Sequence, residues 1–168
     1  MPCLPRHNLN QLHSRPVVLP VPCVQKLLII LEKLAFVKSV KADIKNSAFN
    51  IVFAPNINAN IDELKKAVED AGFSVARLKL VGSFNNVAVK NNEHVEINNQ
   101  AFHFLRVDNQ VLNGEKQITI VDKNYLTPKE FKKFSASTQM ACVHTGKAAD
   151  CCSKEGIRAN TRIYHVTI

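Results

Sequence analysis

The chain of 168 residues is long enough for one large domain or two small ones, and its hydrophobic content of 46% is normal for a packed globular protein. Its net charge of +8 is spread out, with 11 basic and 6 acidic residues up to Leu80 and 11 and 8 beyond it. Such a spread favours a solvated basic surface and argues against nucleic acid as a partner. With five glycines and no glycine-rich phosphate loop, the sequence also excludes the common nucleotide-binding motifs.

Residues 1–14 are interpreted as an irregular N-terminal segment. They have two prolines among the first five residues and no apolar run of the length that a secretory signal peptide needs. Pro16 to Leu19 is predicted to form a short strand at a sheet edge, because proline cannot donate a ladder hydrogen bond. The nearest apolar run, Leu27 to Leu31, is far too short to cross a bilayer, so the sequence predicts no membrane span.

The stretch from Cys23 to Phe73 alternates between helical and strand patterns. Apolar residues from Val24 to Leu34 recur at the three-and-four spacing of one helical face, and a second amphipathic helix begins after Asn60, whose side chain can cap it. Gly72 ends that helix, because glycine accepts the left-handed conformation without steric penalty. The predicted strands are Val37 to Ile44, Phe49 to Phe53 and Val75 to Leu80.

This order of elements resembles the heavy-metal-associated domain of copper chaperones and copper-pumping ATPases. That family has a methionine, any residue and a Cys-x-x-Cys pair opening the first helix, a Gly-Val before the second strand and a Gly-Phe after the second helix. When Val37 is aligned with the valine of Gly-Val, Cys23 falls on the second cysteine of the pair. The departures are Pro20 for the first cysteine, Val18 for the methionine and Phe36 for the glycine. The resemblance implies a ferredoxin-like βαββαβ domain over residues 15–80.

The lost cysteine bears on the metal chemistry that the resemblance implies. Two thiolates two residues apart at a helix start hold Cu(I) or Zn(II) together, because soft sulfur ligands suit those ions. Cys23 alone cannot close such a site, so we favour its interpretation as a partly buried former ligand. A dimer that shares two copies of Cys23, or recruitment of Cys3, would restore a second sulfur.

From Val81 onward, short alternating runs are separated by Asn-Asn and Asn-Gly turn signals, which are typical of antiparallel β structure. Thr127 is predicted to cap a short helix, with Pro128 at its first position and Glu130 completing a capping box. The predicted strands are Asn86 to Val89, His94 to Ile97, Ala101 to Val107, Gln117 to Val121 and Arg162 to Thr167. Residues 81–168 are therefore expected to form a small antiparallel, OB-like β-barrel with one capping helix, which makes the whole chain α+β.

Three cysteines and a histidine lie within eleven residues near the C-terminus: Cys142, His144, Cys151 and Cys152. Their side chains are candidate ligands for Cu or Zn, although the spacing matches no known zinc signature. Cys142 and His144, two residues apart, are expected to project to the same side of a strand. The competing interpretation, which we favour, is a disulfide from Cys142 to Cys151 or Cys152. It would close a loop of about ten residues and stabilise the fold by roughly 2 to 3 kcal/mol. Such a bond favours a periplasmic or extracellular location, in keeping with the exported bacterial protein that the resemblance suggests.

Catalysis finds little support in the residue pattern. Cys142, His144 and Asp150 include the residue types of a thiol triad, but no motif supplies an oxyanion hole, so a structural role is expected. An ordinary surface role, or a role as a hydrogen-bonded core residue, is likewise expected for the strand histidines His94, His103 and His165.

Two functions from different classes follow from these patterns. The first is a non-enzymatic accessory protein of metal handling, which binds Cu or Zn through Cys23 and the C-terminal cluster and works with another metal-handling protein. The second is a metal-free binding module whose barrel recognises a protein, a glycan or an oligonucleotide. An oligonucleotide would need exposed rings, and we expect most of the candidate rings in the core. These rings are Phe84, Phe102, Phe104 and Tyr164.

Overall fold

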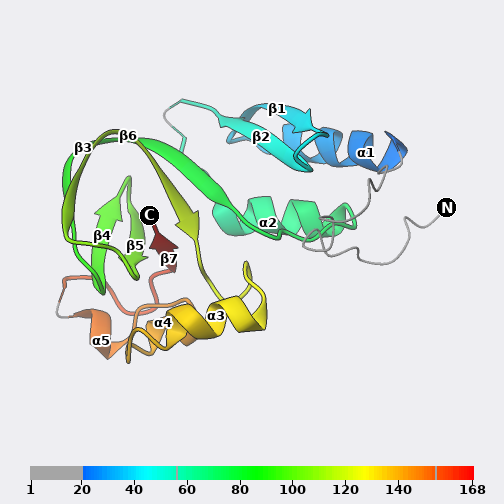
Figure 1. Cartoon of the computed structure of the whole chain (residues 1–168). Coiled ribbons are helices and arrows are strands. Elements are labelled where there is room, and N and C mark those ends of the chain that lie inside the picture. The colour runs from blue at the N-terminus through cyan, green and yellow to red at the C-terminus, as the bar shows by residue number, and fades with distance from the viewer. Residues whose placement is uncertain (1–20, 56, 154) are drawn as a thin grey trace. The chain divides into compact units, whose positions relative to one another are not determined.

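The computed structural model describes residues 21–55, 57–153 and 155–168, which divide into two compact units between Ala76 and Arg77. Segment 1–14 and the edge strand predicted at residues 16–19 lie outside the described residues. Each unit combines helices with β-strands, as Figure 1 shows along the chain, so the predicted α+β class is confirmed.

The described part of the first unit consists of α1 (Val21–Glu32), β1 (Val37–Asp43), β2 (Ala48–Phe53) and α2 (Ile61–Asp70). Strands β1 and β2 pair antiparallel, and α1 lies against both β1 and α2. Leu27 and Leu31, on the apolar face of α1, are almost completely buried. The side chain of Asn60 accepts a hydrogen bond from the amide of Glu63, so the predicted cap of α2 is confirmed.

The third strand predicted for this unit, Val75 to Leu80, is wrong. Residues 75–78 are not in a strand, and Lys79 and Leu80 begin β3 of the second unit, where they pair with Thr119 and Ile118. The local alternation suggested a last strand of the first unit, but Lys79 and Leu80 pair with the long strand of the second unit instead, because tertiary pairing overrides a local strand preference. The finer ferredoxin-like arrangement stays a prediction.

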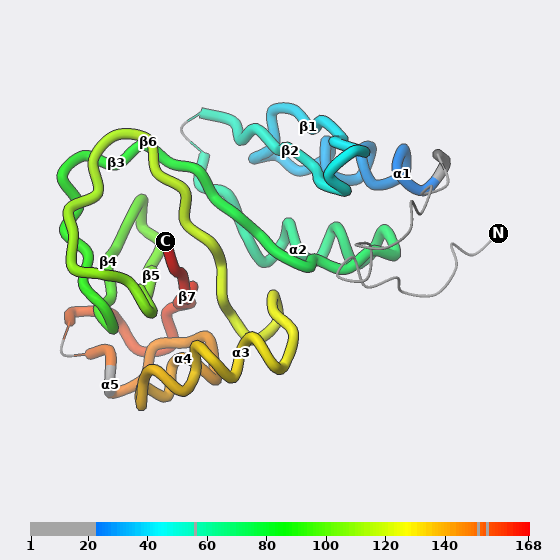
Figure 2. The backbone as a smooth tube through the Cα atoms, in the orientation of Figure 1, coloured from blue at the N-terminus to red at the C-terminus, as the bar shows by residue number. Residues whose placement is uncertain are grey.

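The second unit is built on a five-stranded sheet with the order β3-β6-β7-β5-β4. Its strands are β3 (Lys79–Val89), β4 (Glu93–Ile97), β5 (Gln100–Phe104), β6 (Gln110–Ile120) and β7 (Ile163–Thr167). The long antiparallel pair of β3 and β6 bends with the sheet into a curled half-barrel, which the tube in Figure 2 makes visible. Each of the five predicted strands of this region overlaps one of these strands. A purely antiparallel barrel is wrong, however, because β5 and β7 pair in parallel.

Three helices lie between β6 and β7: α3 (Pro128–Ser135), α4 (Cys142–Thr145) and α5 (Asp150–Ser153). The sequence predicted only the first, and placed Cys142 and His144 on a strand. Gly146, with a φ of 69°, ends α4 in the left-handed conformation that glycine accepts. The core beneath α3 and α4 combines residues from both helices and from the ends of the strands. Its members are Leu105, Val121, Phe131 and Val143.

The start of α3 carries the predicted capping box. Thr127 Oγ1 accepts a hydrogen bond from the Glu130 amide at 3.3 Å, and Glu130 Oε2 accepts one from the Thr127 amide at 3.3 Å. We expect Thr127→Ala to lower the free energy of unfolding by about 1 kcal/mol, because the helix loses a partner for its exposed amides. Urea denaturation will measure the effect. Thr127→Ser, which keeps the hydroxyl, is the control, and equal losses in the two variants would contradict a capping role.

All four aromatic rings that an oligonucleotide would need are buried, with Phe84, Phe102, Phe104 and Tyr164 between 0% and 7% exposed. The expectation that these rings belong to the core is confirmed. Within the described residues, no helix combines the length and the apolar character needed to cross a membrane.

Candidate metal centre

Three histidines stand side by side on three adjacent strands of the second sheet. Asn98 and Asn99, with φ of 49° and 59°, make the two-residue turn between β4 and β5, and this turn sets His94 opposite His103. The parallel pairing of β5 and β7 sets His165 beside His103. Because neighbouring paired residues share one face of a sheet, the three imidazoles lie in a row on the same face.

The histidine row is buried and its rings touch. The exposed fractions of His94, His103 and His165 are 8%, 0% and 0%. The rings of His94 and His103 stack with centroids 4.2 Å apart, and the ring of His165 meets that of His103 edge-on at 5.1 Å. These polar groups therefore occupy core positions that would ordinarily be apolar, and such positions need hydrogen-bond or metal partners.

Cys142, on α4, faces two of these imidazoles. Its Sγ lies 3.6 Å from Nε2 of His94 and 3.7 Å from Nδ1 of His103, and its side chain is completely buried. Packing against Ala101 of β5 and Ile163 of β7 holds the cysteine over the sheet. We call His94, His103 and Cys142 the His2Cys group.

The outer nitrogens of both imidazoles are hydrogen-bonded, which fixes their tautomers. His94 Nδ1 lies 2.5 Å from Oε2 of Glu155, which also accepts from the His94 amide, and His103 Nε2 lies 3.1 Å from Oδ1 of Asn92. Since both oxygens are acceptors, the protons sit on His94 Nδ1 and His103 Nε2. The inner nitrogens therefore direct lone pairs at the sulfur of Cys142.

Burial keeps both imidazoles neutral. Desolvation, followed by the charges of His94 and His165, lowers the pKa of His103 to about 3. Desolvation also lowers the pKa of His94, although the hydrogen bond and charge of Glu155 oppose that shift. Neutral imidazole is the form that binds a metal ion, so the site does not have to lose protons from its histidines at neutral pH.

The spacing of the His2Cys group suits a metal ion. With Zn–N and Zn–S bonds of about 2.05 and 2.3 Å at a tetrahedral angle, nitrogen and sulfur ligands lie about 3.6 Å apart. The two observed distances are 3.6 and 3.7 Å. Among the described residues, these three form the one group of at least three His, Cys, Asp or Glu ligand atoms that all lie within 4.8 Å of one another. The group could therefore hold a metal ion.

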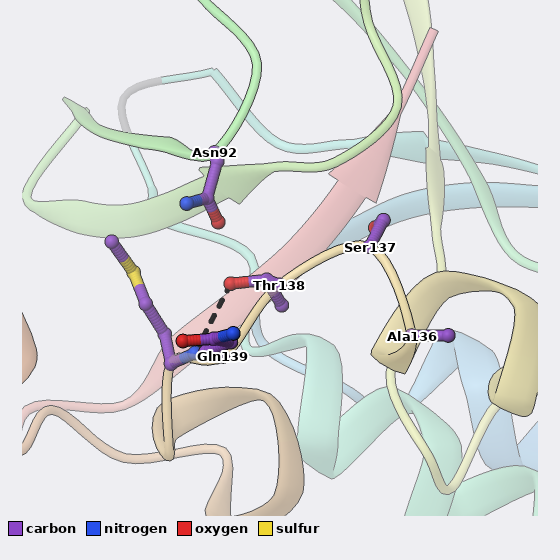
Figure 3. Close-up of a pocket in the computed structure, with 6 residues that line it drawn as sticks. Asn92, Ala136, Ser137, Thr138 and Gln139 are labelled. Atoms are coloured by element: carbon purple, nitrogen blue, oxygen red, sulfur yellow. Dashed lines mark hydrogen bonds between the residues drawn. The ribbon is translucent and has the colours of Figure 1, made fainter.

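A surface hollow of about 460 Å³ lies next to the centre. It is bordered by Asn92 and by the segment from Ala136 to Met140 (Figure 3). Asn92 holds His103 in place, and Met140 packs against the apolar cluster that contains Cys142. The hollow therefore lies beside residues that contact the His2Cys group, although none of the three ligand residues lines it.

The structure separates the ligands that the sequence grouped together. His144 is exposed on α4 with its ring edge-on to that of Phe131, and Cys152 is buried in the apolar cluster beside Cys142. The side chain of Cys151 lies outside the described residues. Cys23 lies on α1 of the first unit and is partly exposed.

Cys142 and Cys152 are not joined to each other in the structure, and the side chain of Cys151 lies outside the described residues, so the disulfide predicted from Cys142 stays a prediction. Cys142 lies on a helix whose packing turns its sulfur toward the histidine row. The argument for an oxidising compartment depended on this disulfide and stays a prediction with it.

His94 and His103 are candidate metal ligands that the sequence analysis did not single out. A signal for them is present: in a hairpin closed by Asn98 and Asn99, residues equally distant from the turn oppose each other, which pairs His94 with His103. Two opposed histidines on one strand pair place two imidazole nitrogens, which are zinc ligands, close together.

Comparisons of the chain with protein-family models, with curated proteins and with solved structures give no match. The resemblance to the heavy-metal-associated domain stays a prediction, and the function has to be argued from the geometry of the site.

Proposed function

We propose that this chain is a non-enzymatic metal-handling protein that binds one Cu or Zn ion through His94, His103 and Cys142. The observation that carries the proposal is the arrangement of two imidazole lone pairs around one thiol. The single S–H proton can satisfy only one of the two acceptors, whereas a metal ion bound to the thiolate satisfies both nitrogens and the sulfur.

The ligand types select the class of metal. One thiolate and two imidazoles suit the borderline and soft ions Zn(II) and Cu(I), and they disfavour Mg and Ca, which prefer oxygen ligands. The hydrogen bonds from His94 to Glu155 and from His103 to Asn92 are the kind that orient metal-bound histidines in proteins.

Burial favours binding over catalysis at this centre. Cys142 and His103 are 0% exposed, so a substrate larger than an ion would have to displace α4 to reach the sulfur. Cys23, on the other unit, is not part of the proposed centre. Its interpretation as a former ligand of a degenerate copper-binding fold is compatible with a protein that now binds its ion elsewhere.

An anaerobic titration with Zn(II), and separately with Cu(I), tests the proposal. We expect equilibrium dialysis followed by elemental analysis to find one ion per chain, and Cys142→Ser to lower the affinity at least 100-fold, since the site loses its thiolate. Cys23→Ser and His144→Ala are matched controls that should bind like the wild type.

Two outcomes would overturn the assignment. Loss of the ion in Cys23→Ser with retention in Cys142→Ser would move the site to the first unit. Absence of stoichiometric metal from the wild-type protein would leave the metal-free binding module as the better interpretation of the chain.

A further inference from the structure

His165 has a buried nitrogen that nothing in the fold explains. Its ring is 0% exposed, and Nδ1 lies 2.6 Å from Oδ1 of Asp122, which also accepts from the His165 amide at 2.9 Å. The proton therefore sits on Nδ1, and Nε2 presents a lone pair. Among the buried side-chain nitrogen and oxygen atoms of the described residues, Nε2 of His165 alone has no hydrogen-bond partner. An unsatisfied buried polar atom is costly, so a ligand for it is expected.

The surroundings of His165 resemble those of His94. Each imidazole has its Nδ1 fixed by a carboxylate that also binds the amide of the same residue: Glu155 for His94 and Asp122 for His165. The two histidines flank His103 on its two neighbouring strands, and all three share one sheet face. The carboxylate and histidine pair is a common outer hydrogen bond of metal-binding imidazoles.

Arg162 ties this second pair to the helix that carries Cys142. Its Nη2 donates to Oδ2 of Asp122 at 2.6 Å, and its Nη1 donates to the carbonyl of Gly146, at the end of α4, at 3.2 Å. The same carbonyl accepts from the amide of Ile163 at 2.9 Å. The Arg162 side chain thus connects Asp122 with the end of α4, next to the start of β7. These contacts help to fix the position of His165 relative to Cys142.

Building on the proposed function, we propose that His165 is the fourth ligand and binds the same ion through Nε2. The ligand atoms of the other three residues already lie within 4.8 Å of one another, whereas His165 is outside that group, so the fourth bond requires its Nε2 to shift toward the other three ligand atoms. Three imidazoles and one thiolate then close a tetrahedron. A closed four-ligand site holds its ion for structure, storage or sensing and leaves no coordination position for a substrate.

Zinc affinity and the visible spectrum of the Co(II)-substituted protein test this assignment in the full chain. We expect His165→Ala to weaken Zn(II) binding about 10- to 100-fold and to change the d–d bands of bound Co(II), because one of the four protein ligands is lost. His144→Ala, which removes an exposed histidine from α4, should change neither the affinity nor the spectrum.

X-ray absorption of the Zn-loaded wild-type protein counts the imidazoles without any substitution, so the test survives if His165→Ala fails to fold. Three histidines and one sulfur support the assignment. Two histidines and one sulfur, or a His165→Ala variant that matches the wild type in affinity and spectrum, would overturn it while the proposed function stands. A wild-type chain that binds no Zn(II) or Co(II) would overturn both.

Discussion

Lowering the pH of the metal-free protein from about 7 to about 4 is expected to reduce the free energy of unfolding of the second unit by roughly 3 kcal/mol through His103 alone. Its pKa in the folded chain is about 3, against 6.5 when unperturbed, because burial and the charges of His94 and His165 disfavour the protonated ring. Between these two values the unfolded chain binds more protons than the folded one. Stability is therefore complete above pH 6.5 and is lost as the pH falls toward 3.

Tyrosine fluorescence during urea denaturation will measure this loss specifically. The chain has no tryptophan, and its two tyrosines, Tyr125 and Tyr164, both belong to the second unit. In His103→Gln, which cannot titrate, the slope below pH 6.5 should flatten by up to about 1.4 kcal/mol per pH unit. The exposed His144, replaced by glutamine, is the control and should keep the wild-type slope. An unchanged slope in His103→Gln would contradict the buried neutral state of the ring.

The elements that the sequence predicted well have strong local signals. Helix α1 has an apolar face, α2 and α3 also have an N-terminal cap, and asparagine turns separate strands of the second unit. Helices α4 and α5 have only four residues each, which is too short to show a helical period, so Cys142 was assigned to a strand. Gly146, just after α4, is the stop signal that was overlooked.

The centre was only partly accessible from the sequence. Counting residues outward from the hairpin turn pairs His94 with His103. The same count cannot place Cys142, which lies 48 and 39 residues from them along the chain. The parallel pairing of β5 and β7, which brings His165 beside His103, joins segments far apart in the chain, so no local sequence pattern predicts it. Sequence proximity instead suggested that Cys142 belongs with His144, Cys151 and Cys152, although the fold turns the sulfur toward the sheet.

The largest loss of stability from a single substitution near the centre is expected for Asp122→Ala. The carboxylate is 5% exposed and accepts from His165 Nδ1, from the His165 amide and from Nη2 of Arg162. Its removal leaves an arginine charge and two buried donors without their acceptor. Breaking one partner of a buried ion pair in this way typically costs about 3 to 5 kcal/mol, which should appear as a lower urea midpoint in tyrosine fluorescence.

Two further variants separate the parts of this effect. Asp122→Asn keeps the shape and one acceptor oxygen but loses the charge, so an intermediate loss is expected, because Arg162 and His165 bind different oxygens of the carboxylate. Asp108→Ala removes an exposed carboxylate of the same unit and should change stability by less than about 0.5 kcal/mol. If Asp122→Ala is as stable as Asp108→Ala, Asp122 does not hold β7 and α4 together. The position of His165 relative to Cys142 would then have to be fixed by other contacts. The proposed link runs through the guanidinium group of Arg162, which contacts both Gly146 and Asp122.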